Sequence, residues 1–164
     1  MDEPLLHIVL YQPEIPQNTG NVGRLCLGLS ARLHLIPPLG FDLSERAVRR
    51  AGLDYWKNVD LTVHKDAEAF WAWSVGRRLW LFSSHGARVY TDIEFADGDV
   101  LMFGCETSGL PKALCEARGS WFIPMPGGTR SLNLPNAIAI VAWEALRQRT
   151  NSVRQLTGGT ATPR

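Results

Sequence analysis

Residues 100–111 read VLMFGCETSGLP, an apolar run that gives way at Gly104 to small and polar residues. The apolar run predicts a buried β-strand, and the turn after it leaves backbone N–H groups free at the end of that strand. Two further segments of this kind stand at 18–24 (NTGNVGR) and 123–136 (IPMPGGTRSLNLPN). Because open α/β sheets bind ligands at polar turns of this type, the three segments together predict a binding site.

Strands and helices alternate along the chain. Apolar runs predict strands at 5–11, 32–36, 60–63, 78–82, 100–103 and 121–123. Helical patterns predict helices at 19–30, 44–51, 67–73 and 134–149. This order predicts an α/β fold with a single domain over 1–150, in which a mainly parallel sheet is flanked by helices. We expect residues 151–164, which are small and polar, to form a disordered tail.

Composition excludes several classes of protein. A length of 164 residues suits a single core, and a hydrophobic content of 45% excludes a disordered chain. No stretch approaches the ~20 apolar residues that span a bilayer, and no basic segment leads into an apolar run at the N-terminus. We therefore expect a cytoplasmic protein with no membrane partner. The net charge of +1 is a weak signal for nucleic-acid binding.

No metal site is expected. Three cysteines, an odd number without metal-ligand spacing, fit a reducing compartment, and Cys26 lies on an apolar helix face where it is expected to be core. The histidines also lack ligand spacing and are expected to be structural or at the surface: His7, His34, His64 and His85.

The helix expected at 19–30 has two unlike sides. At ~100° per residue, one side is an apolar stripe that must face the core, made of Val22, Leu25, Cys26 and Leu29. The opposite side carries Arg24 among small residues: Gly20, Gly28 and Ala31. Glycine costs about 1 kcal/mol against alanine inside a helix, so these glycines suggest that another backbone comes close and that Arg24 reaches across. A surface arginine in a salt bridge is the alternative.

Taken in order, the three segments resemble the SPOUT superfamily of RNA methyltransferases. Within it they are most similar to the small tRNA 2'-O-methyltransferases that modify the wobble nucleotide. The resemblance also includes 10–16 (LYQPEIP) and 49–55 (RRAGLDY), and it extends from Leu6 to about Arg147. It implies the fold of that superfamily, with a deep trefoil knot in the C-terminal part, which neither periodicity nor composition predicts.

The resemblance implies methyl transfer from S-adenosyl-L-methionine to the ribose 2'-hydroxyl of the wobble nucleotide of leucine tRNAs, a cytidine or a carboxymethylaminomethyluridine at position 34. The sulfonium carries its own leaving group, so the protein chiefly aligns the reactants and needs neither a metal nor a nucleophile. Two alternatives stay open. One is methylation of another tRNA or rRNA nucleotide, and the other is an RNA-binding or assembly factor that keeps the fold without catalysis.

The same resemblance implies roles for individual residues. It makes Arg24 the residue that engages the 2'-hydroxyl, by polarising and positioning it rather than by removing its proton. Gly104 would let the adenosine approach the backbone closely. The cofactor would be held at the ends of three strands by Phe82, Ser83, Phe103, Gly104, Glu106, Ile123, Met125, Ser131, Leu132 and Asn133.

Glu106 and Asn133 are expected to brace these loops through hydrogen bonds to backbone N–H groups. Each has a simpler alternative. Glu106 could be an acid at the start of a helix near Pro111. Asn133 and Ser131 could be only caps of the last helix.

The expected RNA partner is the anticodon stem-loop of tRNA. Contacts to it are expected from the basic cluster Arg46, Arg49 and Arg50 and from Trp143, a position where the resemblance implies tyrosine. For the arginines, a solvated face is the alternative.

The last helix predicts a homodimer. Residues 137–143 (AIAIVAW) are apolar all round, and such a helix should be buried on every side, which a small domain can hardly arrange alone. The small residues on the helix at 19–30 would allow close packing against a partner. If the two helices pair across a twofold axis, Arg24 of one chain would point at the cofactor loops of the other, as the resemblance also implies.

Overall fold

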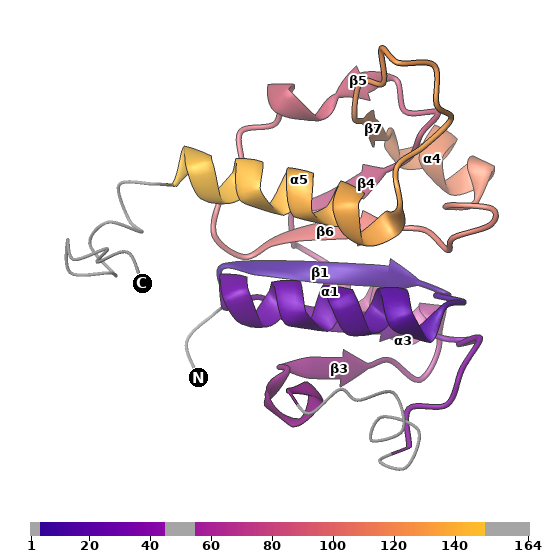
Figure 1. Cartoon of the computed structure of the whole chain (residues 1–164), viewed down its shortest axis with the longest axis vertical. Helices are drawn as coiled ribbons and strands as arrows, with labels where there is room; N and C mark the ends of the chain where they lie inside the picture. The colour runs from indigo at the N-terminus through magenta and orange to yellow at the C-terminus, as the bar shows by residue number, and fades with distance from the viewer. Residues whose placement is uncertain (1–3, 45–54, 150–164) are drawn as a thin grey trace.

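The computed structural model describes residues 4–44 and 55–149 of the chain. Within them a sheet of seven strands, all paired in parallel, has the order β3-β2-β1-β6-β4-β7-β5 (Figure 1). The strands are β1 Leu6–Tyr11, β2 Arg32–Ile36, β3 Leu61–Val63, β4 Leu79–Phe82, β5 Arg88–Val89, β6 Asp99–Phe103 and β7 Trp121–Phe122. All the predicted strands are therefore confirmed, each end lying within one residue of its expected position. The two-residue β5 was not predicted.

Helices cover both faces of this sheet. α1 (Pro16–Leu29) and α5 (Leu134–Gln148) pack against each other on the face nearer the viewer in Figure 1. α3 (Ala67–Ser74) and α4 (Lys112–Arg118) lie behind the sheet, and short 3₁₀ turns occupy Trp56–Asn58 and Tyr90–Asp92. The helix expected at 44–51 and the tail expected at 151–164 fall largely or wholly outside the described residues. The knot stays a prediction.

The ends of α1 have local causes. The helix begins at Pro16 rather than at Thr19, because proline is tolerated in a first turn, where its missing N–H would have no helical partner. It ends at Leu29 because Ser30 adopts a left-handed conformation, with φ 51° and ψ 39°, and breaks the helical repeat.

The core follows the predicted apolar stripes. On α1, Val22, Cys26 and Leu29 are buried, and they pack with the inward side of α5 and with alternate residues of β1. Burial raises the pKa of the Cys26 thiol to about 12, with the charge of Asp60 adding to the shift. This thiol is therefore neutral, and its place in the core is as expected.

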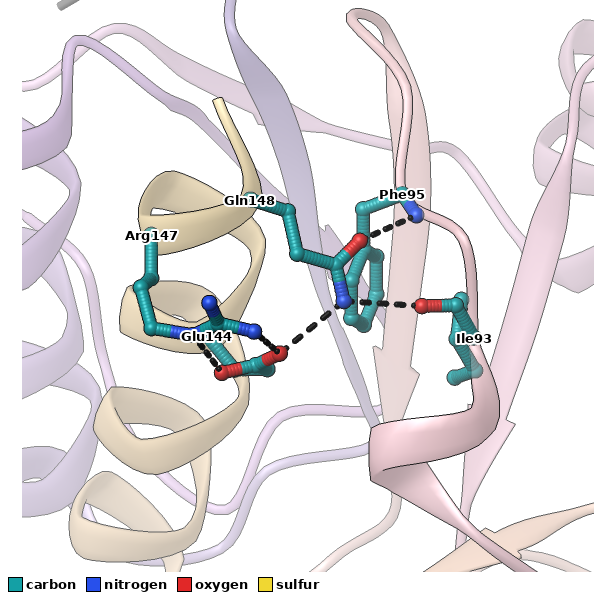
Figure 2. Close-up of polar contacts among 5 residues, drawn as sticks. All are labelled: Ile93, Phe95, Glu144, Arg147 and Gln148. Carbon is teal, nitrogen blue, oxygen red and sulfur yellow. Dashed lines mark hydrogen bonds and ion pairs between the residues drawn. The ribbon is translucent and has the colours of Figure 1, made fainter. Parts of the chain in front are cut away.

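The C-terminal end of α5 is fastened to the segment that precedes β6 (Figure 2). Gln148 donates from Nε2 to the Ile93 carbonyl at 2.9 Å, and its Oε1 accepts from the Phe95 N–H at 2.9 Å. Glu144, one turn earlier, accepts from both Gln148 and Arg147. These bonds fix the far end of the helix whose N-terminus enters the site described below.

Three of the histidines form a buried chain that the sequence did not reveal. His7 Nδ1 lies 2.9 Å from His34 Nε2, and His34 Nδ1 lies 3.0 Å from His64 Nε2. They stand on β1, on β2 and directly after β3, three neighbouring strands, and each exposes less than a tenth of its surface. Trp73 of α3 covers all three rings, with centroid distances between 4.3 and 5.8 Å. The prediction of a structural role is confirmed for these three, whereas His85 is exposed.

The buried row of histidines predicts that the free energy of unfolding falls at acidic pH. Burial, aided by the neighbouring His7 and His64, lowers the pKa of His34 from 6.5 to about 2, and burial also lowers the pKa of His64. The unfolded chain protonates His34 near pH 6.5, and the folded chain does so only at a much lower pH. The stabilisation is therefore complete above pH 6.5 and is lost below it, by about 1.4 kcal/mol per pH unit for His34.

Urea unfolding at pH 7.5, 6.0 and 5.0 measures this slope. In His34→Gln, we expect the slope below pH 6.5 to shrink by about 1.4 kcal/mol per pH unit. His85→Gln, at an exposed histidine, is the matched control and should leave the slope unchanged. Parallel curves for wild type and His34→Gln would contradict the assignment.

Candidate functional site

The carboxyl ends of β6, β4 and β7 lie side by side and open onto a cavity of about 1320 Å³. Because parallel strands end at the same edge of a sheet, the loops that leave them meet there. All ten residues expected at the cofactor line this cavity: Phe82, Ser83, Phe103, Gly104, Glu106, Ile123, Met125, Ser131, Leu132 and Asn133. His85 and Arg130 line it as well. Segments from Phe82 to Asn133 are thus brought to one place.

The floor of the cavity is apolar and tightly built. The rings of Phe82 and Phe103 stack with their centroids 4.8 Å apart and their planes 13° from parallel. Both are nearly buried, with 7% and 3% of their surface exposed. The Ser83 N–H donates to the Trp121 carbonyl at 2.9 Å and so ties the end of β4 to β7. An aromatic floor framed by backbone groups suits a flat heterocycle such as adenine.

Gly104 makes a close approach, but its neighbour is the chain itself. A Cβ at this position would lie 2.0 Å from the carbonyl carbon of Gly109 and 2.1 Å from the nitrogen of Leu110. Gly109 folds back with φ at +69°, and its N–H donates to the Cys105 carbonyl at 3.0 Å. The space that a side chain at Gly104 would need is therefore filled by the returning loop. Gly104 still lines the cavity, and its close approach to adenosine stays a prediction.

Glu106 braces a loop, as expected, and the loop belongs to the start of α1. Its carboxylate accepts from the N–H groups of Glu14 at 2.8 Å and Ile15 at 3.2 Å. It also accepts from Asn18 Nδ2 at 3.1 Å. The alternative role at a helix start is wrong, because α4 begins only at Lys112 and the hydrogen bonds of Glu106 go elsewhere.

Asn133 occupies the N-cap position of α5, yet its side chain makes no capping hydrogen bond. Its backbone carbonyl accepts from the Ala137 N–H at 3.0 Å. The alternative in which the Asn133 side chain is only a cap is therefore wrong, and so is the corresponding one for Ser131, which precedes the cap position by two residues. Both side chains border the cavity and are exposed. A bracing role for Asn133 stays a prediction.

Arg24 lies on the exposed side of α1 and does not line the cavity of its own chain, as far as the described residues define it. Its guanidinium carbon stands 4.5 Å above the centroid of the Tyr55 ring. The Tyr55 hydroxyl donates to the Gly20 carbonyl at 2.9 Å, which fixes the ring. Among the described residues no carboxylate pairs with Arg24, so the salt-bridge alternative finds no partner there.

The small-residue side of α1 is less open than expected. Gly20 and Ala31 are buried, and Gly28 is exposed with free space where a Cβ would stand. The close contact falls instead at Gly23, where a Cβ would lie 2.6 Å from the Trp56 ring.

The apolar helix α5 is not buried on every side within one chain, in line with the expectation that a small domain can hardly bury it alone. Ile140 and Trp143 expose 37% and 44% of their surface, and Leu27 of the adjacent α1 exposes 37%. A protomer thus presents an apolar strip along the α1 and α5 side. Arg46, Arg49 and Arg50 lie outside the described residues.

Three contributors to the site escaped prediction: Tyr55 under Arg24, and the pair Glu14 and Thr107. Tyr55 stands at the end of the 49–55 segment that carried part of the resemblance, so a signal for it existed. For Glu14 and Thr107, 93 residues apart, no local pattern indicates a contact. No helix in the described part of the chain is long and apolar enough to cross a membrane, and those residues hold no metal-binding cluster.

Comparisons with known proteins agree with this architecture. The profile of the SpoU rRNA Methylase family matches residues 5–143. The tRNA (cytidine(34)-2'-O)-methyltransferase of Escherichia coli strain K12 is 44% identical over 147 residues, which cover 88% of this chain and 94% of the relative. The enzyme of the same name from Methylovorus glucosotrophus is 45% identical over 150 residues, covering 88% and 96%.

Solved structures show the same fold. One, described as giving insight into the 2-OH methylation of C/U34 on tRNA, superposes with a TM-score of 0.85 at 48% identity and covers 92% of this chain and 99% of its own. The SpoU methyltransferase AviRb from Streptomyces viridochromogenes, in complex with AdoMet, superposes with a TM-score of 0.76 at 25% identity, covering 92% and 60%.

Proposed function

The chain belongs to the SpoU rRNA methylase family, and from this premise we propose that it methylates the ribose 2'-hydroxyl of the wobble nucleotide of tRNA, using S-adenosyl-L-methionine. The substrate we propose is the cytidine or carboxymethylaminomethyluridine at position 34 of leucine tRNAs. One observation carries this proposal: relatives named for methylation of cytidine 34 match this chain over nearly their whole length at 44–45% identity.

The cavity fits the proposed cofactor. Its aromatic floor suits the adenine, and the loops after β4, β6 and β7 offer backbone groups around it. At about 1320 Å³ it exceeds the ~300–1,000 Å³ typical of a small-molecule site, which leaves space for part of a nucleotide as well. Bound there, the cofactor would supply a methyl group on a sulfonium that is its own leaving group. The protein's task is then to place the ribose hydroxyl.

Arg24 is the residue we propose for that task. A guanidinium presents several N–H donors in a fixed plane and keeps its charge, so it can orient a hydroxyl oxygen and favour the negative charge that develops on it. Stacking on Tyr55 limits the rotamers of the side chain before the RNA arrives. This preorganisation supports a positioning role rather than proton abstraction.

A homodimer would complete the site. Arg24 stands outside the cavity of its own chain, on the helix beside the exposed Ile140 and Trp143 of α5. Pairing the α1 and α5 sides of two chains would cover this apolar strip. It would also allow Arg24 of one chain to face the cavity of the other. Both features support a site shared between chains.

The RNA contacts of this proposal rest on the charge of three arginines and on the exposure of Trp143. Arg46, Arg49 and Arg50 are proposed to bind the anticodon stem-loop, and the exposed Trp143 is proposed to stack on it or on the partner. Because a chain with a net charge of +1 holds phosphates weakly, doubling these residues in a dimer would strengthen the binding.

Two measurements test the function. Nucleoside mass spectrometry of tRNA from cells that lack the protein should show loss of 2'-O-methylation at position 34 of leucine tRNAs, whereas loss at another nucleotide would overturn the substrate. Calorimetric titration with S-adenosylhomocysteine should show micromolar or tighter binding. If no binding is detected, the non-catalytic RNA-binding alternative is favoured instead.

A further inference from the structure

Two loops that are far apart in sequence leave the sheet side by side. β1 and β6 are parallel neighbours with Leu10 paired to Phe103, so the segments that follow them, 12–15 and 104–110, start next to each other. Glu106 in the second loop accepts hydrogen bonds from the first, as described above. The first loop also holds the second, through a separate set of bonds.

That second set joins Glu14 to Thr107. The Glu14 carboxylate accepts from the Thr107 N–H at 3.0 Å, and the Thr107 hydroxyl lies 2.9 Å from each of its oxygens. Hydrogen bonds to an ionised carboxylate are shorter and stronger than those between neutral groups. Each loop therefore donates N–H groups to an acidic side chain of the other.

The Glu14 side of this pair of hydrogen-bonded loops, called the clamp below, is anchored to a third segment of the chain. The Pro13 carbonyl accepts from the Gly40 N–H at 2.9 Å. Gly40 packs so closely that a Cβ there would lie 2.7 Å from the Glu14 carbonyl oxygen. The helix that follows is anchored in the core by Val22 and Cys26.

The Thr107 side is exposed. Thr107, Ser108 and Gly109 all face solvent, and the Ser108 hydroxyl lies 3.0 Å from the Cys105 sulfur of the same loop. The same loop walls the cavity, whereas Glu14 does not line it. The hydrogen bonds between Glu14 and Thr107 thus fasten an exposed wall of the cavity to the anchored segment that precedes α1.

We propose that Glu14 is a positioning residue for the cofactor: its carboxylate holds Thr107 so that the loop 105–109 keeps the shape of the binding wall before the cofactor arrives. This inference rests on the proposed function, because it assigns the cavity to S-adenosyl-L-methionine. A wall ordered in advance spares the cofactor the entropic cost of ordering it on binding. Loss of the clamp should therefore weaken cofactor binding and leave the rate of the bound complex nearly unchanged.

The variants are Glu14→Ala, Thr107→Val and their combination, with Thr107→Ser as the conservative rescue and Glu68→Ala, at an exposed acid on α3, as the matched control. In the free protein we measure amide hydrogen exchange at residue 107. In Glu14→Ala we expect it to accelerate at least about tenfold, because the N–H loses its carboxylate acceptor.

Glu14→Ala should raise the Kd for S-adenosylhomocysteine about tenfold. The KM for S-adenosyl-L-methionine should rise by the same factor, whereas kcat should stay within about threefold of wild type. Thr107→Val, which removes only the hydroxyl, should raise Kd about threefold, and Thr107→Ser and Glu68→Ala should match wild type. In the Glu14→Ala background, Thr107→Val should add nothing further.

An unchanged Kd in Glu14→Ala, an unchanged exchange rate, or an effect on kcat alone would each overturn the inference. A wild-type protein that binds S-adenosylhomocysteine and shows the clamp behaviour, but methylates no tRNA, would overturn the proposed substrate and leave the inference standing. A wild-type protein that binds no S-adenosylhomocysteine would overturn both.

Discussion

Arg24→Ala is expected to abolish methyl transfer and to leave the affinity for S-adenosylhomocysteine within about threefold of wild type. Removing a preorganised charged donor that acts in the transition state costs on the order of 10²–10³ in kcat. Arg24 stands apart from the cavity of its own chain, so the binding of cofactor to that chain does not depend on it. Single-turnover rates and calorimetry on the purified variant measure the two quantities separately.

Arg118→Ala is the matched control for this prediction. Arg118 is also exposed and stacks on an aromatic ring, 4.6 Å above Trp71, but it lies at the end of α4 behind the sheet. It should retain wild-type activity. Residual activity of Arg24→Ala within tenfold of wild type would rule out the proposed role of Arg24.

Gly104→Val is expected to eliminate cofactor binding and, in addition, to destabilise the fold. The sequence alone predicts the first effect without the second. The structure adds the second, because the new Cβ would collide with the backbone of Gly109 and Leu110 and push the loop off β6. Overpacking of this kind costs about 1–3 kcal/mol, and the displaced loop is the wall of the cavity.

Urea unfolding and calorimetric titration check the two parts. Gly127→Ala is the matched control, since it adds the same Cβ in the loop before α5 where nothing lies within 4 Å. It should leave stability and binding unchanged. Full affinity for S-adenosylhomocysteine in Gly104→Val would place the cofactor elsewhere.

Mixing these two damaged chains tests the shared site. With Arg24 supplied by one chain and the cavity by the other, a dimer of an Arg24→Ala chain and a Gly104→Val chain has one site built from two undamaged halves. We therefore expect the mixture to regain activity that neither variant shows alone, with light scattering to confirm that dimers form. A mixture that dimerises and stays inactive would place each site within a single chain.

The strands and most helices could be predicted because their causes are local. Each of the longer strands is an apolar run closed by turn-forming residues, and α1 and α5 carry clear apolar stripes. The elements that were missed lack such signals. β5 has only two residues, and α4 buries none of its side chains, so neither produces a periodic pattern.

For the candidate site, the position of its residues could be predicted but their contacts could not. The ten residues that the resemblance implies at the cofactor all border one cavity, because the parallel strands that carry them end at a common edge of the sheet. What each of those residues touches was not visible. Glu106 turned out to hold the start of α1, and Gly104 to pack against residues 109–110.

The sequence by itself determined the elements, the buried stripe of α1 and the identity of the loops at the strand ends, since periodicity and turn chemistry act between neighbouring residues. Only the tertiary structure decided which of these meet. His7, His34 and His64 form one chain because β1, β2 and β3 are adjacent, and Glu14 reaches Thr107 because β1 lies beside β6. Strand order and register join residues 27 to 93 positions apart, and a contact over such a distance depends on the packing of the whole sheet rather than on the residues near either end.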